Sequence, residues 1–296
     1  MRESFPSENS RIPEGINASQ ANPLREFLAL IVGVGLALVL SITVAVLGIE
    51  VLTPYIPFEW ELKIQSPVEL LAGQEGLNKP SEEASRALVQ LGEALVASSM
   101  QVPIGEKQAA QQVPPEYFSF HLVHYSQPNA FATFGAVIAV TDALPQQVES
   151  ENGLAMVLAH EIAHIQLRHP IAAASRSVVV QLMLAIVLGD NSNQLLSTGS
   201  ILTLLNFNRE MELAADQRAL DILRVHYGHL IGADELFKVF SAREDGSAWL
   251  EFSRTHPNSE RRLQNIREAM ADMPAGEVRA LPVALQTPLS TVADES

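Results

Sequence analysis

A short segment, residues 154–170, carries the residue types best suited to metal chemistry. It contains the pattern His-Glu-x-x-His at His160, Glu161 and His164. Positions four apart on an α-helix lie on one face, so both imidazoles can bind the same ion. Glu161 is rotated by about 100° from His160 and could reach a water on that ion. The pattern predicts a helical zinc site with Glu161 as its base, although two surface histidines can share this spacing by chance.

A catalytic zinc site needs a third protein ligand and leaves its fourth position for water. His169 is the nearest candidate, but it should lie about 140° away from the face of His164, and we expect a residue at the helix C-terminus instead. Glu212 is the better candidate, in the segment NREMELAADQRAL. Asp216, four residues further on, could accept an N–H from a ligating histidine and fix its tautomer. The alternative is a solvated acidic face on a surface helix.

The composition restricts both the metal ligands and the partners. The 296 residues include no cysteine, so any metal must be held by His, Asp or Glu. With 34 acidic and 19 basic residues the formal net charge is −15, which argues against a nucleic-acid partner. Because 47% of the residues are hydrophobic and 18% are charged, the chain is not a disordered acidic one.

The run from Phe27 to Gly48 contains no charged residue. Its length as a helix is about 33 Å, enough to cross a hydrocarbon core of about 30 Å and longer than the apolar part of a signal peptide. Arg2, Arg11 and Arg25 precede it, whereas the first basic residue after it is Lys63. By the positive-inside rule we expect a single-pass anchor in a bacterial inner (cytoplasmic) membrane, with the chain beyond it in the periplasm.

The rest of the chain divides by pattern. We expect a cytoplasmic tail, an anchor, a juxtamembrane connector, a main domain and a mobile tail, at residues 1–26, 27–48, 49–80, 81–273 and 274–296. Within the main domain the patterns predict a helix capped by Ser81, β-structure in residues 117–125 and 130–141 with a break at Gly135, and helices from about 149 to 270. This order predicts an α+β, helix-rich fold with a small β-sheet.

Two further apolar runs, residues 178–188 and 201–205, are too short to cross a bilayer. We expect buried or interface helices there. The alternative is shallow contact with the membrane.

Four motifs together resemble one family. They are PNAFATFG at 128–135, the His-Glu-x-x-His helix, Asn-Arg-x-x-Glu-x-x-Ala-Asp at 208–216 and THPNSERRL at 255–263. In this order they resemble the HtpX-like zinc metallopeptidases, which include the CAAX prenyl endopeptidases and periplasmic proteases. The resemblance covers about residues 115–270 and implies a gluzincin-type domain with one zinc ion on His160, His164 and Glu212. HtpX-type members carry several membrane spans, so this chain looks closer to single-span or periplasmic relatives.

The resemblance also implies roles for two residues near the C-terminus. It places the loop of His256 beside the active site and Arg262 at the family's basic position there. His256 could donate a hydrogen bond to the oxyanion during catalysis, or bind the resting zinc and keep the enzyme latent. Without the resemblance, His256 would be an exposed loop histidine.

The sequence therefore predicts a membrane-anchored zinc metalloendopeptidase that acts in membrane or envelope protein quality control. Glu161 would take a proton from water and pass it to the leaving amine. Unfolded or damaged protein substrates could add as a strand along Asn129, Ala130, Phe131 and Ala132. The other predicted partner is membrane lipid, through the anchor, whereas the pattern does not predict an oligomeric state. The alternative function is a tethered chaperone or assembly factor with a structural zinc ion and a client groove.

Overall fold

The computed structural model describes residues 22–64, 68, 81–103, 112–177, 207–242, 256 and 260–286. It divides into two compact units, Met1–Val44 and Ala45–Ser296. The apolar runs 178–188 and 201–205 lie outside the described residues, so our predictions for them stay predictions.

The first long helix, α1 (Pro23–Leu52), contains the predicted anchor and extends beyond it at both ends. It begins where the side chain of Asn22 accepts a hydrogen bond from the N–H of Leu24 at 3.1 Å. Its segment Pro23–Ile49 is long enough to cross a membrane, and an 18-residue window within it has a mean hydropathy of 2.8. The helix therefore fits a single-pass membrane anchor.

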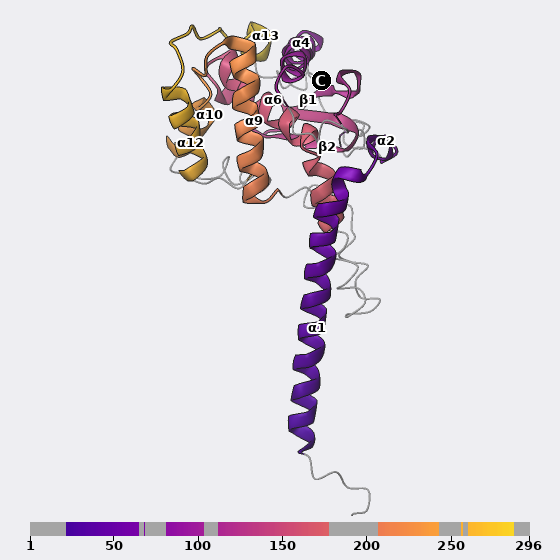
Figure 1. The fold of residues 1–296 in the computed structure, drawn as a ribbon. Coiled ribbons are helices and arrows are strands. Elements are labelled where there is room, and N and C mark those ends of the chain that lie inside the picture. Colours follow the sequence, from indigo (N-terminus) through magenta and orange to yellow (C-terminus); the bar gives the residue numbers. More distant parts are fainter. Residues whose placement is uncertain are drawn as a thin grey trace, which may run out of the picture. The chain divides into compact units, whose positions relative to one another are not determined.

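The second unit combines helices with a small sheet (Figure 1). In chain order its further elements are η1 (Thr53–Tyr55), α2 (Phe58–Glu61), α4 (Glu82–Ser99), η2 (Pro115–Tyr117), β1 (Ser119–Val123), β2 (Ala130–Thr133), η3 (Phe134–Ala136), β3 (Val137–Thr141), η4 (Pro145–Gln147), α6 (Glu151–Gln166), α9 (Arg209–Tyr227), α10 (Glu235–Ala242), α12 (Glu260–Ala271) and α13 (Val283–Gln286). This confirms the predicted α+β, helix-rich fold.

The sheet has the strand order β1-β3-β2. β2 and β3 pair antiparallel across the predicted break, where Gly135 adopts a φ of +71° that suits glycine. β1 pairs with β3 in parallel. Because β3 lies between the other two strands, β2 is at an edge of this sheet.

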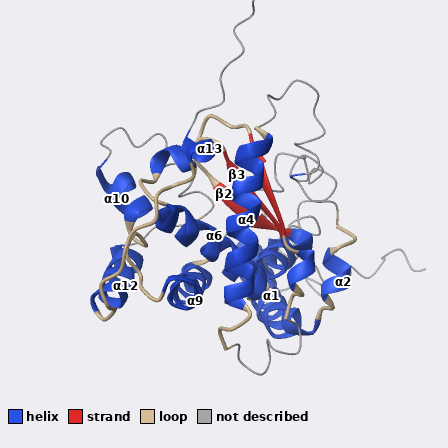
Figure 2. Cartoon of the chain, turned by 90° about the horizontal axis from the view of Figure 1, so that it is seen from above, coloured by secondary structure: helices blue, strands red, loops and turns tan. Residues whose placement is uncertain are grey.

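Three helices form the framework behind the site. Ser81, Ser150 and Asn208 cap α4, α6 and α9, each accepting a backbone N–H from the first turn. α6 packs against α9, and α4 packs against both; α4 also contacts β1, and α6 contacts β2 (Figure 2). Large apolar side chains fill the space between these elements, among them Leu88, Leu95, Ile138, Leu158, Ile162 and Ile222.

The edges of the main domain differ from those predicted. Residues in the expected connector are folded, since Phe58 and Glu61 of α2 are buried. The prediction of a mobile tail from residue 274 is wrong for residues 280–286: Ala280 forms a β-bridge with Ser150, and α13 contacts α4 and η4. Leu281 and Leu285 are buried in that contact, and two apolar residues gave too short a pattern to predict it.

Candidate metal centre

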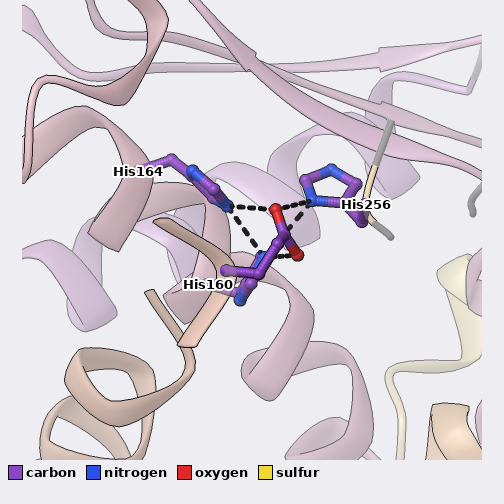
Figure 3. Close-up of side chains that lie close together, drawn as sticks. His160, His164 and His256 are labelled. Atoms are coloured by element: carbon purple, nitrogen blue, oxygen red, sulfur yellow. Dashed lines mark hydrogen bonds and ion pairs between the residues drawn. The ribbon is translucent and has the colours of Figure 1, made fainter. Parts of the chain in front are cut away.

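Two packed helices bring the predicted ligands together. α6 carries His160 and His164 one turn apart, and α9 brings Glu212 against them (Figure 3). The two Nε2 atoms lie 2.9 Å apart. Glu212 places Oε1 at 3.3 Å from Nε2 of His164 and Oε2 at 3.5 Å from Nε2 of His160. All three side chains are buried, so these atoms converge on one enclosed point.

His256 joins this group from a distant part of the chain (Figure 3). Its Nδ1 lies 3.2 Å from Oε1 of Glu212 and 3.4 Å from Nε2 of His160. One donor atom from each of the four residues lies within 4.8 Å of the others. The side chain of His256 is fully buried, which excludes the exposed loop histidine.

The donor set fits a divalent cation such as zinc. Bond lengths of about 2.0–2.1 Å in a tetrahedral site place neighbouring donor atoms about 3.3 Å apart. The separations between the donor atoms of His160, His164 and Glu212 run from 2.9 to 3.5 Å. Imidazole and carboxylate are also the ligand types that zinc takes from a chain without cysteine.

Glu161, the predicted base, faces the same point. It is fully buried, and neither of its carboxylate oxygens has a hydrogen-bond donor among the described residues. The ring of His256 lies beside it, with Nε2 at 3.5 Å from Oε1 of Glu161. A buried carboxylate in this state indicates a partner such as a water or a metal-held group.

Asp216 and Arg262 lie behind the ligands. Asp216 places Oδ1 at 3.0 Å from Nδ1 of His160 and is almost fully buried, so it does not belong to a solvated face. Arg262 donates from Nε and Nη2 to both oxygens of Asp216, at 2.6 and 2.7 Å. Its Nη1 lies 2.5 Å from Oε2 of Glu212. Through these ion pairs Arg262 holds the carboxylates of Glu212 and Asp216 in position, which we call its holding function.

The electrostatics of the group favour positive charge at its centre. Burial alone would lower the pKa of His160, but hydrogen bonds to Asp216 and Glu212 and their negative charges outweigh burial and raise the pKa to about 9. Burial alone would raise the pKa of Glu212, but the charge of His256 and hydrogen bonds from histidines hold the pKa well below its usual value. The surroundings therefore stabilise a cation beside an ionised carboxylate.

The expectation for His169 is wrong. α6 ends at Gln166, Arg168 adopts a φ of +59°, and a new helical stretch begins at His169, so the two stretches do not form one continuous helix. His169 is therefore buried beside His164, with the two Nδ1 atoms 2.9 Å apart. Burial lowers the pKa of His169 to about 3. A straight helix would have put His169 on another face than His164, but the turn at Arg168 interrupts the helix.

Two further contacts in this part of the domain were not predicted. Phe207 stacks on the ring of His164 with centroids 3.9 Å apart, and Glu61 pairs with Arg168. The position of Phe207, an apolar residue just before the cap Asn208, was a signal that it could be buried near the site. Nothing in the sequence links Glu61 to Arg168, which lies far along the chain.

The predicted substrate strand lies next to the active helix. β2 contacts α6 and sits at the edge of the described sheet. Its residues are buried, as is the preceding Asn129, whose side chain accepts the N–H of Ala130 at 2.9 Å.

Arg262 should be essential for the stability of the metal-free protein. Replacing it with Gln leaves Glu212 and Asp216 buried without their guanidinium partner, so we expect Arg262→Gln to lower the free energy of unfolding by about 3–5 kcal/mol. Arg261→Gln changes the exposed neighbour and should alter the same quantity by less than about 0.5 kcal/mol. Denaturant titration of the full chain in detergent measures both, and equal losses would contradict the holding function.

Comparisons with known proteins give the family. The chain is 35% identical over 159 residues to the mitochondrial metalloendopeptidase OMA1 of Schizosaccharomyces pombe, covering 51% of this chain and 46% of that protein. It is 48% identical over 52 residues to the beta-barrel assembly-enhancing protease of Yersinia pestis, covering 18% and 11%. The chain thus spans less than half the length of these relatives. The profile of Peptidase family M48 matches residues 96–270, more than half of the chain. This confirms the resemblance seen in the motifs: the chain belongs to peptidase family M48, a family of metallopeptidases.

Proposed function

We propose that this protein is a zinc-dependent metalloendopeptidase of the His-Glu-x-x-His type. One observation carries the proposal: three donor side chains converge beside Glu161, a buried carboxylate whose oxygens have no hydrogen-bond donor among the described residues. His160, His164 and Glu212 would hold the zinc ion.

The proposed chemistry assigns a role to each residue. A zinc ion held by His160, His164 and Glu212 would supply Lewis acidity to the scissile carbonyl and to a water. Glu161 takes a proton from the attacking water and delivers it to the leaving amine. Asp216, whose Oδ1 lies 3.0 Å from Nδ1 of His160, would accept the N–H of that nitrogen and so keep the ring in the tautomer needed by a ligand. Arg262 holds both carboxylates of α9 in place.

We propose that substrate binds as an added strand along β2, which is an edge strand among the described residues. The N–H of Thr141 donates to the carbonyl of Asn129 at 2.9 Å, so that pair faces inward. Alternation in an antiparallel ladder then directs the backbone groups of Ala130 and Ala132 away from β3. The N–H of Ala130 is already bonded to the side chain of Asn129, which leaves the N–H of Ala132 as the donor for a peptide. Main-chain pairing of this kind accepts many sequences and suits unfolded or damaged proteins.

One observation favours the alternative function. His256 adds a fourth protein donor to the group, and four protein ligands are typical of structural zinc sites. A tethered chaperone or assembly factor with a closed zinc site would use such a set. The carboxylate of Glu161, buried next to the donors, favours the enzyme instead, because a structural site needs no base.

We propose that the protein works at a bacterial inner membrane with its peptidase domain in the periplasm. Support comes from the apolar helix and from the arginines that precede it. Both named relatives are proteases, and the Yersinia pestis protein is named for beta-barrel assembly. A protease held at the membrane with a sequence-tolerant substrate edge would serve membrane or envelope quality control.

Glu161→Gln should distinguish the metalloendopeptidase from the alternative function as a chaperone or assembly factor. The substitution keeps the size of the side chain and leaves every ligand in place, so zinc should stay at one ion per chain while casein hydrolysis falls by at least about 100-fold. Glu210→Gln, on the exposed face of α9, should leave both unchanged. A chelator should abolish the parent activity. Full activity of Glu161→Gln would exclude the proposed base.

His256→Ala should reveal which of two roles His256 has. If His256 donates a hydrogen bond to the oxyanion, the catalytic rate should fall by about 10²–10³-fold at unchanged zinc content. If it binds the resting zinc and blocks the water position, basal proteolysis should rise. Steady-state hydrolysis of a peptide substrate, with zinc content measured in parallel, distinguishes the two, and a rate equal to that of the parent would refute both.

The topology can be tested with a reporter. Since we place the N-terminus in the cytoplasm, a fusion after Ser296 should give an extracytoplasmic signal, and alkaline extraction should leave the protein in the membrane fraction. A cytoplasmic signal would reverse the orientation. A soluble product that begins near residue 50 would show a cleaved signal peptide instead of an anchor.

A further inference from the structure

The ring nitrogen of His164 that points away from the donor group, Nδ1, has a hydrogen-bonding partner. Its Nε2 faces the donor group, whereas its Nδ1 lies 2.9 Å from Nδ1 of His169. The two rings meet edge to face with centroids 4.9 Å apart, and His169 is only 7% exposed. A neutral imidazole carries one N–H and one lone pair, so a metal can bind only the nitrogen without the hydrogen. The partner at Nδ1 therefore decides whether Nε2 of His164 can act as a ligand.

We propose that His169 is a positioning residue: its Nδ1 accepts the Nδ1–H of His164, which keeps the lone pair on Nε2 directed at the metal. The proposal rests on the metal centre proposed above. His160 has the matching arrangement, with its Nδ1 3.0 Å from Oδ1 of Asp216. Each of the two ligating histidines would thus have its tautomer fixed by a partner at Nδ1: the carboxylate of Asp216 for His160 and the imidazole of His169 for His164.

The turn that presents His169 is held by the juxtamembrane segment. Arg168, the residue before it, has a φ of +59°, a region that side chains other than glycine seldom occupy. Its guanidinium contacts Oε1 of Glu61 through Nε at 2.8 Å and Nη2 at 2.6 Å, and Nη2 also donates to the carbonyl of Ile56 at 3.0 Å. Arg168 and Glu61 are both almost fully buried. The ion pair between Glu61 and Arg168 therefore fixes the turn in place, and the turn in this way positions the ring of His169.

Zinc affinity of the full chain in detergent tests the role of His169. Partners of this kind contribute about 10–100-fold in metal affinity. We expect His169→Leu, which removes the acceptor, to raise the zinc Kd by about that factor in competition with a fluorescent chelator. His169→Asn puts an amide oxygen where Nδ1 stood and should keep the Kd within about threefold of the parent. Cobalt(II) absorption of each variant reports the ligand geometry independently of hydrolysis.

A second pair of variants tests the juxtamembrane contact. Glu61→Gln weakens the hold on the turn and should raise the zinc Kd in the same direction as His169→Leu, by a smaller factor. Glu59→Gln alters an exposed carboxylate of the same short helix and should have no effect. Since Glu61 makes no contact with the ligands, the effect would have to pass through the turn. If His169→Leu does not fold, His169→Asn and Glu61→Gln still decide the matter.

Three results would overturn the inference. A zinc Kd of His169→Leu within twofold of the parent would show that the hydrogen bond is unimportant. Equal losses in His169→Asn and His169→Leu would reduce His169 to a packing role. Equal effects of Glu61→Gln and Glu59→Gln would remove the juxtamembrane contact. A parent protein that binds no zinc would refute the metal centre as well, whereas an active parent with an unaffected His169→Leu would refute only this inference.

Discussion

Three buried carboxylates at one place form the constraint on which the rest of the structure depends. Glu161, Glu212 and Asp216 lie together, and each ionised group loses several kcal/mol of hydration when it is buried. Among the described residues, the guanidinium of Arg262 pairs with two of them and leaves Glu161 without a donor. A divalent cation at the histidines would supply the remaining positive charge. The domain therefore has to bring parts of α6, α9 and α12, together with His256, to a single point.

The packing of α6 on α9 makes that convergence possible. Small residues allow the two helices to lie close together, and the helix positions around the ligands are accordingly occupied by buried alanines, namely Ala159, Ala163, Ala215 and Ala219. Side-chain caps at Ser150 and Asn208 fix where each helix starts and hence where its ligands fall. A shift of either helix by one residue would rotate its ligands by about 100° and separate them.

Local patterns predicted the parts of this site that a single helix determines. His160 and His164 share a face because of their spacing, and the same rule relates Glu212 to Asp216. The cap at Ser81 and the break at Gly135 were likewise visible in short segments. The burial of His256, the position of His169 and the pairing of β1 with β3 depend on contacts between distant segments. No period or spacing in the sequence encodes those contacts, and the resemblance to the family was the one signal for His256.

The contact between Glu61 and Arg168 also could not be predicted from local patterns, and it bears on the site. Pro and Glu in that segment suggested a connector, yet Glu61 lies 107 positions before Arg168 and pairs with it in the interior. A buried charge that loses its partner destabilises a protein by about 3–5 kcal/mol. Cleavage between α1 and α2 would leave Glu61 on the same chain as Arg168, whereas removal of α2 as well would take Glu61 away from its partner. The proposed hold on the turn beside His164 therefore depends on α2 itself and not on the apolar helix that precedes it.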